Sequence, residues 1–127
     1  MKILPIEIEV PASGPRERAR LLPGTLSLPG PARGLVAFAH GSGSSRLSPR
    51  NTYVAEVLQR AGIAPLVFDL LTPDEDRDRS VRFDIALLTS RLLLAADWIE
   101  GRPELRSLPL GYFGASTGAA AALEAAA

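Results

Sequence analysis

The chain has 127 residues, of which 46% are hydrophobic and 22% charged, and its 14 basic and 14 acidic residues cancel. This composition suffices for the packed core of one small domain, and the balanced charge shows no basic excess for nucleic-acid binding. The absence of cysteine excludes disulfides, a thiol nucleophile and Cys-ligated zinc. No apolar run approaches the roughly 18 residues of a membrane span, and no apolar leader precedes a cleavage site. We therefore expect a cytoplasmic protein that binds neither nucleic acid nor membrane.

Two antiparallel strands are predicted within about residues 3–28. Apolar side chains alternate with glutamates between Ile6 and Val10, which is the period-two pattern of a half-buried strand. A turn-rich stretch ending in Pro23-Gly24 follows, and residues 25–28 then alternate again. These features predict a strand, a long turn and a second strand.

A β/α core is predicted for residues 34–127. Its strands are the continuous apolar runs 35–39, 65–68 and 109–113, and its helices begin near residues 49, 83 and 117. Ser48 and Pro49 have the residue types of an N-cap and a first helical position. Strands that alternate with helices indicate right-handed crossovers, so we predict an α/β fold whose mostly parallel sheet has helices on both faces.

The segment Gly114-Ala115-Ser116-Thr117-Gly118 matches the pattern G-x-S-x-G between a predicted strand and a predicted helix. In such a nucleophile elbow, the tight turn forces the serine into a strained backbone conformation and exposes its hydroxyl. Gly114 and Gly118 would keep side chains from colliding there. We predict a positive φ at Ser116 and assign it as the nucleophile, the alternative being a chance match in a glycine-rich chain.

A second Gly/Ser-rich loop, His40-Gly41-Ser42-Gly43-Ser44-Ser45, follows the strand at 35–39. Its glycines would let the backbone approach a reacting group closely. A phosphate-binding loop is the alternative, but the third glycine of the dinucleotide fingerprint is missing and no Gly-Lys-Ser/Thr follows. Because the carboxyl ends of parallel strands bind ligands, both loops are candidate site elements.

With these loops and this element order, the chain resembles the α/β-hydrolase superfamily. The stretches FAHGSGSS, SPRNTYVAEVL, FDLLTP and GYFGASTGAAAAL look like its dienelactone hydrolase-like branch, from about Leu21 to the final residue. The resemblance implies hydrolysis of an ester, lactone or thioester through an acyl-enzyme on Ser116. The backbone N–H groups of Ser42 and Thr117 would form the oxyanion hole. True dienelactone hydrolases use a cysteine nucleophile where this chain has serine.

In this fold the triad runs serine, acid, histidine, so the general base would lie downstream of Ser116. His40 is the only histidine and lies upstream. We expect it to order its loop together with Gly41 and Gly43, and a role as base is the less favoured alternative. Since the chain ends nine residues after Gly118, we interpret it as an inactive N-terminal fragment of a longer hydrolase.

The resemblance implies a small-molecule acyl substrate, no metal and no organic cofactor. Relatives of this kind are sometimes joined to a phosphoribosyltransferase domain. A noncatalytic binding or scaffold protein with the same fold is the second hypothesis. Structural roles are expected for the other polar or aromatic residues of note, which are a loop-capping Asp69, a solvated acidic cluster at 74–78, a helix-start pair at Arg82 and Asp84, and a core Trp98.

Overall fold

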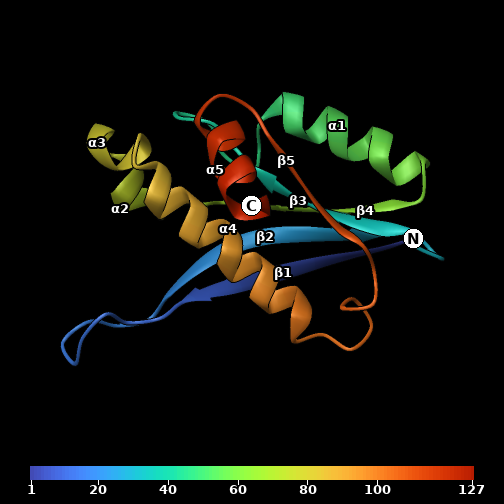
Figure 1. The fold of residues 1–127 in the computed structure, drawn as a ribbon, viewed down its shortest axis with the longest axis horizontal. Helices are drawn as coiled ribbons and strands as arrows, with labels where there is room; N and C mark the ends of the chain where they lie inside the picture. Colours follow the sequence, from blue (N-terminus) through green and yellow to red (C-terminus); the bar gives the residue numbers. More distant parts are fainter.

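The computed structural model describes all 127 residues, and its centre is one five-stranded sheet (Figure 1). The strand order is β1-β2-β4-β3-β5. The strands span Lys2–Val10 (β1), Arg20–Leu28 (β2), Gly34–Ala39 (β3), Ile63–Phe68 (β4) and Leu110–Gly114 (β5). The predicted antiparallel pair β1–β2 and the predicted α/β core are therefore confirmed.

The sheet is mixed, and the prediction of a mostly parallel sheet is only partly right. β3 pairs in parallel with β4 and β5, whereas β2 pairs antiparallel with both β1 and β4. The β2–β4 pairing joins Gly24–Leu26 to Leu66–Phe68 and brings the leading hairpin into the core sheet. A Cβ atom added at Gly24 would lie 2.6 Å from the Phe68 Cβ atom, so this close approach requires glycine.

β2 begins earlier than predicted and includes Pro23, which was assigned to a turn. The Pro23 carbonyl accepts a hydrogen bond of 3.0 Å from the Asp69 N–H group. The backbone N and C=O of one residue in an antiparallel strand point to the same neighbouring strand. The Pro23 nitrogen, which has no hydrogen, therefore also faces β4 and Asp69. Proline therefore leaves this pair with one hydrogen bond instead of two, just beyond the end of β4 at Phe68.

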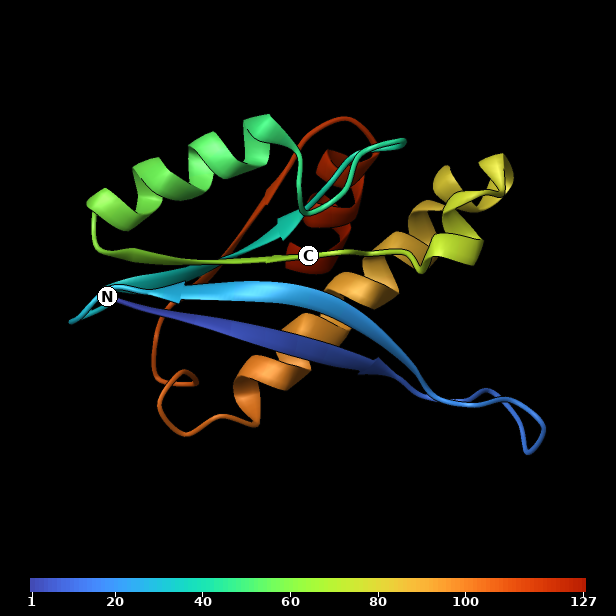
Figure 2. The same ribbon diagram turned by 180° about the vertical axis from the view of Figure 1, so that it is seen from behind.

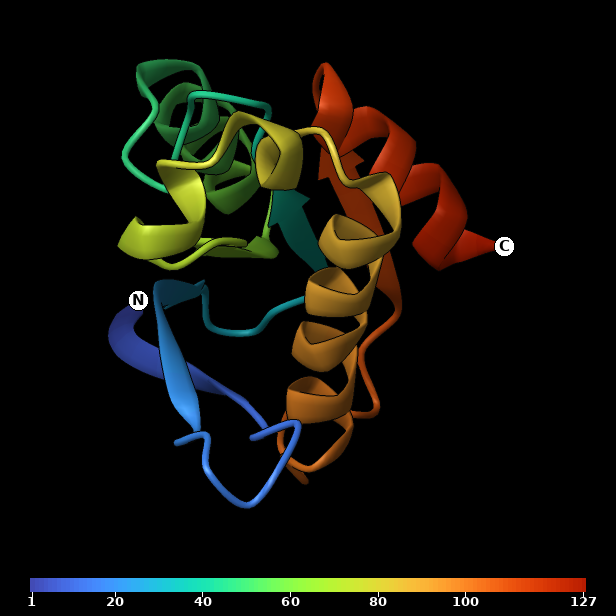
Figure 3. The same cartoon turned by 90° about the vertical axis from the view of Figure 1, so that its left-hand side faces the viewer.

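Helices cover both faces of the sheet, as predicted. They span Pro49–Arg60 (α1), Pro73–Asp76 (α2), Arg79–Arg82 (α3), Ile85–Glu100 (α4) and Thr117–Ala126 (α5). α1 lies on one face, whereas α4 and α5 lie together on the other (Figures 2 and 3). No helix combines the length and the apolar character needed to cross a membrane.

The main hydrophobic core lies between the sheet and α4. One side of α4 is buried at Leu88, Leu92, Ala95 and Ile99, in one cluster with Leu35 and other inward-facing strand residues. Asp84 caps this helix through a 3.0 Å hydrogen bond from the Leu87 N–H group, as expected. Trp98 only borders the core and is half-buried, with the Arg102 guanidinium 4.7 Å from its ring centre.

β5 forms one edge of the sheet, where β3 is its only neighbouring strand. Its residues are half-buried or exposed, because no strand pairs with its outer side in this chain. Burial raises the pKa of the Tyr112 hydroxyl, and the nearby Asp97 carboxylate raises it further.

Candidate active site

Ser116 occupies the predicted turn between β5 and α5. Its φ of 58° and ψ of −128° make it the one non-glycine residue with a positive φ. The predicted strained conformation is thus confirmed, and such a conformation costs on the order of 1–3 kcal/mol. The residue is exposed, so the turn presents the Ser116 side chain to solvent.

The turn packs directly against the end of β3, and glycines make this possible. A Cβ atom added at Gly118 would lie 2.0 Å from the Ala39 carbonyl oxygen, and one at Gly114 would lie 2.2 Å from the Gly118 carbonyl oxygen. A Cβ atom at Gly41 would come within 3.1 Å of the Ser116 Cβ atom. The two Gly/Ser-rich loops predicted from the sequence therefore touch through their backbones.

His40 is buried beneath its loop, and both of its ring nitrogens are engaged. Nε2 accepts a 2.9 Å hydrogen bond from the Leu70 N–H group, so this nitrogen carries no proton. Nδ1 lies 3.2 Å from the Gly41 carbonyl oxygen and is the donor of the neutral ring. This pairing orders the loop and leaves no ring nitrogen for the Ser116 hydroxyl.

The far side of the His-Gly loop is tied to the end of β4. Asp69 accepts a hydrogen bond of 2.9 Å from the Arg46 N–H group and pairs with the Arg46 guanidinium at 2.5 Å. Asp69 therefore caps a loop, as expected, but it is the preceding loop rather than the following one. Gly43, between these anchors, has a φ of +74°, which favours glycine.

A polar cavity of about 330 Å³ separates the two loops and the start of α1. Ser42 and Ser116 both line it, together with Gly41, Ser44, Ser48, Pro49, Arg50, Asn51 and Ala115. A larger cavity of about 550 Å³ lies at the amino ends of β3 and β5, away from Ser116. Of these two cavities, the smaller one adjoins the strained serine.

Two backbone donors predicted for an oxyanion hole are available in this region. The Ser42 N–H group donates to no acceptor in the protein. Thr117 is the first residue of α5, where an N–H group has no partner within its own helix. The Thr117 hydroxyl is buried without a hydrogen-bond partner, so its side chain contributes no hydrogen bond to the site.

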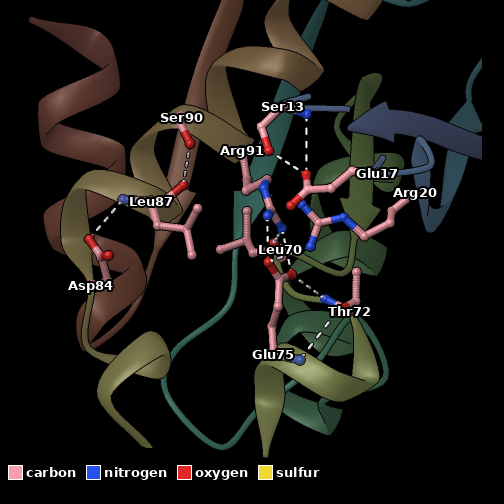
Figure 4. Close-up of polar contacts among 10 residues, drawn as sticks. All are labelled: Ser13, Glu17, Arg20, Leu70, Thr72, Glu75, Asp84, Leu87, Ser90 and Arg91. Carbon is pink, nitrogen blue, oxygen red and sulfur yellow. Dashed lines mark hydrogen bonds and ion pairs between the residues drawn. The ribbon is translucent and has the colours of Figure 1, made fainter. Parts of the chain in front are cut away.

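Beneath His40, the Leu70 segment is held by a buried ion pair that was not predicted from the sequence (Figure 4). Arg91 is 3% exposed and donates to the Leu70 carbonyl oxygen at 3.0 Å. Its guanidinium also binds both carboxylate oxygens of Glu75, at 2.8 and 2.6 Å. Glu75 was predicted to lie in a solvated acidic loop, which is wrong for this residue because it neutralises a buried cation.

Glu75 is held as a carboxylate by several partners. Burial alone would raise its pKa, but the hydrogen bonds from Arg91 and Thr72 and the charges of Arg91 and Arg20 outweigh burial and lower the pKa to about 2. Glu75 also forms a capping box at the start of α2, since Thr72 and Glu75 exchange hydrogen bonds. The sequence signal for the pair was Arg91 itself, a charged residue three positions after Leu88 on the buried face of α4.

Comparison with solved structures shows the same fold. The dienelactone hydrolase from Anabaena variabilis is 55% identical, with a TM-score of 0.80 over 96% of this chain and 57% of that chain. The Pyrococcus furiosus esterase Pf2001 is 22% identical, with a TM-score of 0.71 over 97% of this chain and 46% of that chain, and it supports the fold alone. No family model matches the sequence.

Curated relatives carry a different name. "Putative phosphoribosyl transferase Rv0571c" of Mycobacterium tuberculosis is 62% identical over 104 residues, which are 82% of this chain and 24% of that protein. The chain thus spans about a quarter of this relative and just over half of the Anabaena enzyme.

The mixed sheet with helices on both faces, together with the serine turn after β5, defines an α/β-hydrolase fold. Among proteins with this fold, the chain is similar in sequence to the matched part of the Anabaena dienelactone hydrolase.

Proposed function

We propose that this chain supplies the nucleophile and the oxyanion hole of a serine hydrolase that cleaves an ester, lactone or thioester. The strained conformation of Ser116 carries the proposal. A strained backbone conformation persists in a folded protein only when the surrounding structure imposes it. At Ser116 this conformation leaves the hydroxyl exposed at the start of a helix. The hydrolase and esterase structures that share this fold support the same chemistry.

In the proposed reaction, the Ser116 hydroxyl attacks the acyl carbon of a small-molecule substrate and loses its proton to a general base. The backbone N–H groups of Ser42 and Thr117 stabilise the resulting oxyanion. The leaving alcohol or thiol departs, and water then releases the acyl group from Ser116. Because His40 is fully engaged with Leu70 and Gly41, we place the base and its orienting acid outside this sequence.

The phosphoribosyl transferase name of the curated relatives fits the same proposal. We assign that name to a separate region within the three quarters of those proteins that this chain does not cover. The proposed hydrolase therefore acts beside another domain. We also propose a cytoplasmic location, because the cysteine-free sequence needs no oxidising compartment.

A fluorophosphonate probe tests the proposal, because it labels activated serines. A protein with the full length of the relatives should be labelled stoichiometrically at Ser116, and Ser116→Ala should abolish labelling. Ser107→Ala, which alters an exposed serine with no side-chain hydrogen bond, should leave it unchanged. The 127-residue chain alone should not react, since it lacks a base. A full-length protein that never labels would favour a noncatalytic scaffold, and rapid labelling of the chain alone would make His40 the base after all.

A further inference from the structure

The amino end of α1 lines the cavity beside Ser116, through Ser48, Pro49, Arg50 and Asn51. Ser48 holds the predicted N-cap position, but its side chain makes no capping hydrogen bond. The first backbone N–H group of the helix with a helical partner is that of Thr52, which donates to the Ser48 carbonyl oxygen. The N–H groups of Arg50 and Asn51 donate to no acceptor in the protein. An uncapped helix start of this kind attracts negative charge.

Asn51 gives independent evidence for a ligand at this position. Its side chain is 5% exposed, yet it forms no hydrogen bond and lines the same cavity as Ser116. Since the Asn51 amide atoms are not among the fully buried polar atoms that lack a partner, they remain open to a group bound in this cavity. An asparagine amide can offer two N–H donors to such a group.

The charges around the cavity favour an anion. Arg50 lines it with an exposed guanidinium, and the first turn of α1 contains no acidic residue. The nearby Asp69 carboxylate is already neutralised by Arg46. An oxygen anion at this place would meet backbone, amide and guanidinium donors and no competing negative group.

We infer that the start of α1 binds an anionic group, a carboxylate or a phosphonate, at the far end of the substrate of the proposed hydrolase. The inference rests on that proposed function and narrows the substrate to an anionic ester. The anion sits at Arg50 and Asn51, and the scissile bond reaches Ser116 across the same cavity of about 330 Å³. That volume suits a small acyl group with one charged end.

Kinetics on the full-length protein test the preference. The substrates are 4-nitrophenyl hydrogen adipate, its neutral terminal carboxamide, and the analogue that ends in a phosphonate. We expect kcat/KM for an anionic ester to exceed that of the carboxamide at least tenfold, and the better of the two anions identifies the group. Arg50→Gln and Asn51→Asp should each remove most of this preference, measured as the ratio of kcat/KM for the anionic ester to that for the carboxamide. Arg60→Gln, at the other end of the same helix, should change neither rate.

A binding measurement separates this inference from the hydrolase proposal. Asn51 is the only asparagine in this sequence, so its NMR signals in 15N-asparagine-labelled protein can be assigned by comparison with Asn51→Ala. In Ser116→Ala protein, monomethyl adipate or its phosphonate analogue should shift these signals saturably, and the neutral amide should not. Equal or absent shifts with all three compounds would overturn the anion site, even if esters are hydrolysed. Saturable shifts without any hydrolysis would keep the site and reject the hydrolase.

Discussion

Gly118→Ala tests whether the candidate site is held together by backbone contact. The added methyl carbon would lie 2.0 Å from the Ala39 carbonyl oxygen, 2.7 Å from its carbonyl carbon and 2.8 Å from the His40 carbonyl oxygen. All three atoms are main-chain atoms at the end of β3, so no side-chain rotation relieves the overlap. Either α5 or the His-Gly loop must move.

Overpacking in well-ordered cores costs typically about 1–3 kcal/mol and occasionally more. Because three backbone atoms are involved here, we expect a loss of roughly 3 kcal/mol in the free energy of unfolding. The better helix propensity of alanine returns at most about 1 kcal/mol of this. With a urea m-value of about 2 kcal/mol/M, the net loss lowers the unfolding midpoint by roughly 1 M or more.

Gly111→Ala is the matched control, because Gly111 lies in β5 and an added Cβ atom would find its nearest neighbour, a Val36 methyl, at 3.9 Å. Urea unfolding of both variants, followed by circular dichroism, gives the comparison. We expect Gly111→Ala to stay within about 0.5 kcal/mol of the parent. If Gly118→Ala unfolds at the same midpoint as this control, the elbow is not wedged against β3 and the reasoning fails.

Three further predictions concern neighbouring residues. Ser116→Gly should be about 1 kcal/mol more stable than Ser116→Ala in thermal unfolding, because glycine adopts the positive φ at little cost, and equal stabilities would argue against strain. Thr117→Val removes a buried hydroxyl without a partner, so stability should rise by about 1 kcal/mol while probe labelling stays within twofold; a large loss of labelling would show that the hydroxyl participates. The Glu75 pKa of about 2 lies below the ordinary 4.5, so its ion pair stabilises the fold above pH 4.5 and this stabilisation is lost as pH falls from 4.5 towards 2. Glu75→Gln should cost roughly 3 kcal/mol at pH 7 by leaving Arg91 unpaired, and it should flatten stability between pH 5 and 2; an unchanged pH profile would contradict this role.

Local patterns predicted the elements and the elbow because their causes are local. The flanks of Ser116 determine a strand-to-helix turn, and a turn that tight forces the positive φ that the structure shows. The buried apolar residues of α4 likewise recur every three or four positions, which is the spacing of one helix face. Predictions that required knowledge of distant partners were weaker. The antiparallel β2–β4 pairing depends on the contact between Gly24 and Phe68, which are 44 positions apart in the sequence. The residues around Gly24 carry no pattern that predicts this contact.

The Arg91–Glu75 pair escaped sequence reasoning for a related reason. Glu75 stands among acidic residues that are mostly exposed, and only the path of the chain through α2 and α3 turns this one carboxylate towards α4. The signal that remained was the apolar face of α4, where a lone arginine requires a partner. Such a residue predicts that a counterion exists but not which acidic residue supplies it.

The contacts around Ser116 divide into two kinds with different consequences. Its position relative to the His-Gly loop is fixed by backbone atoms meeting at Gly118 and Gly41, where any side chain would collide. The loop is fixed in turn through His40 and Leu70 to the Arg91 guanidinium. None of these groups needs to touch a substrate, so they can hold the geometry for many esters. Selectivity then falls to side chains that the fold leaves unpaired at the cavity, and Asn51 is the most deeply buried of these.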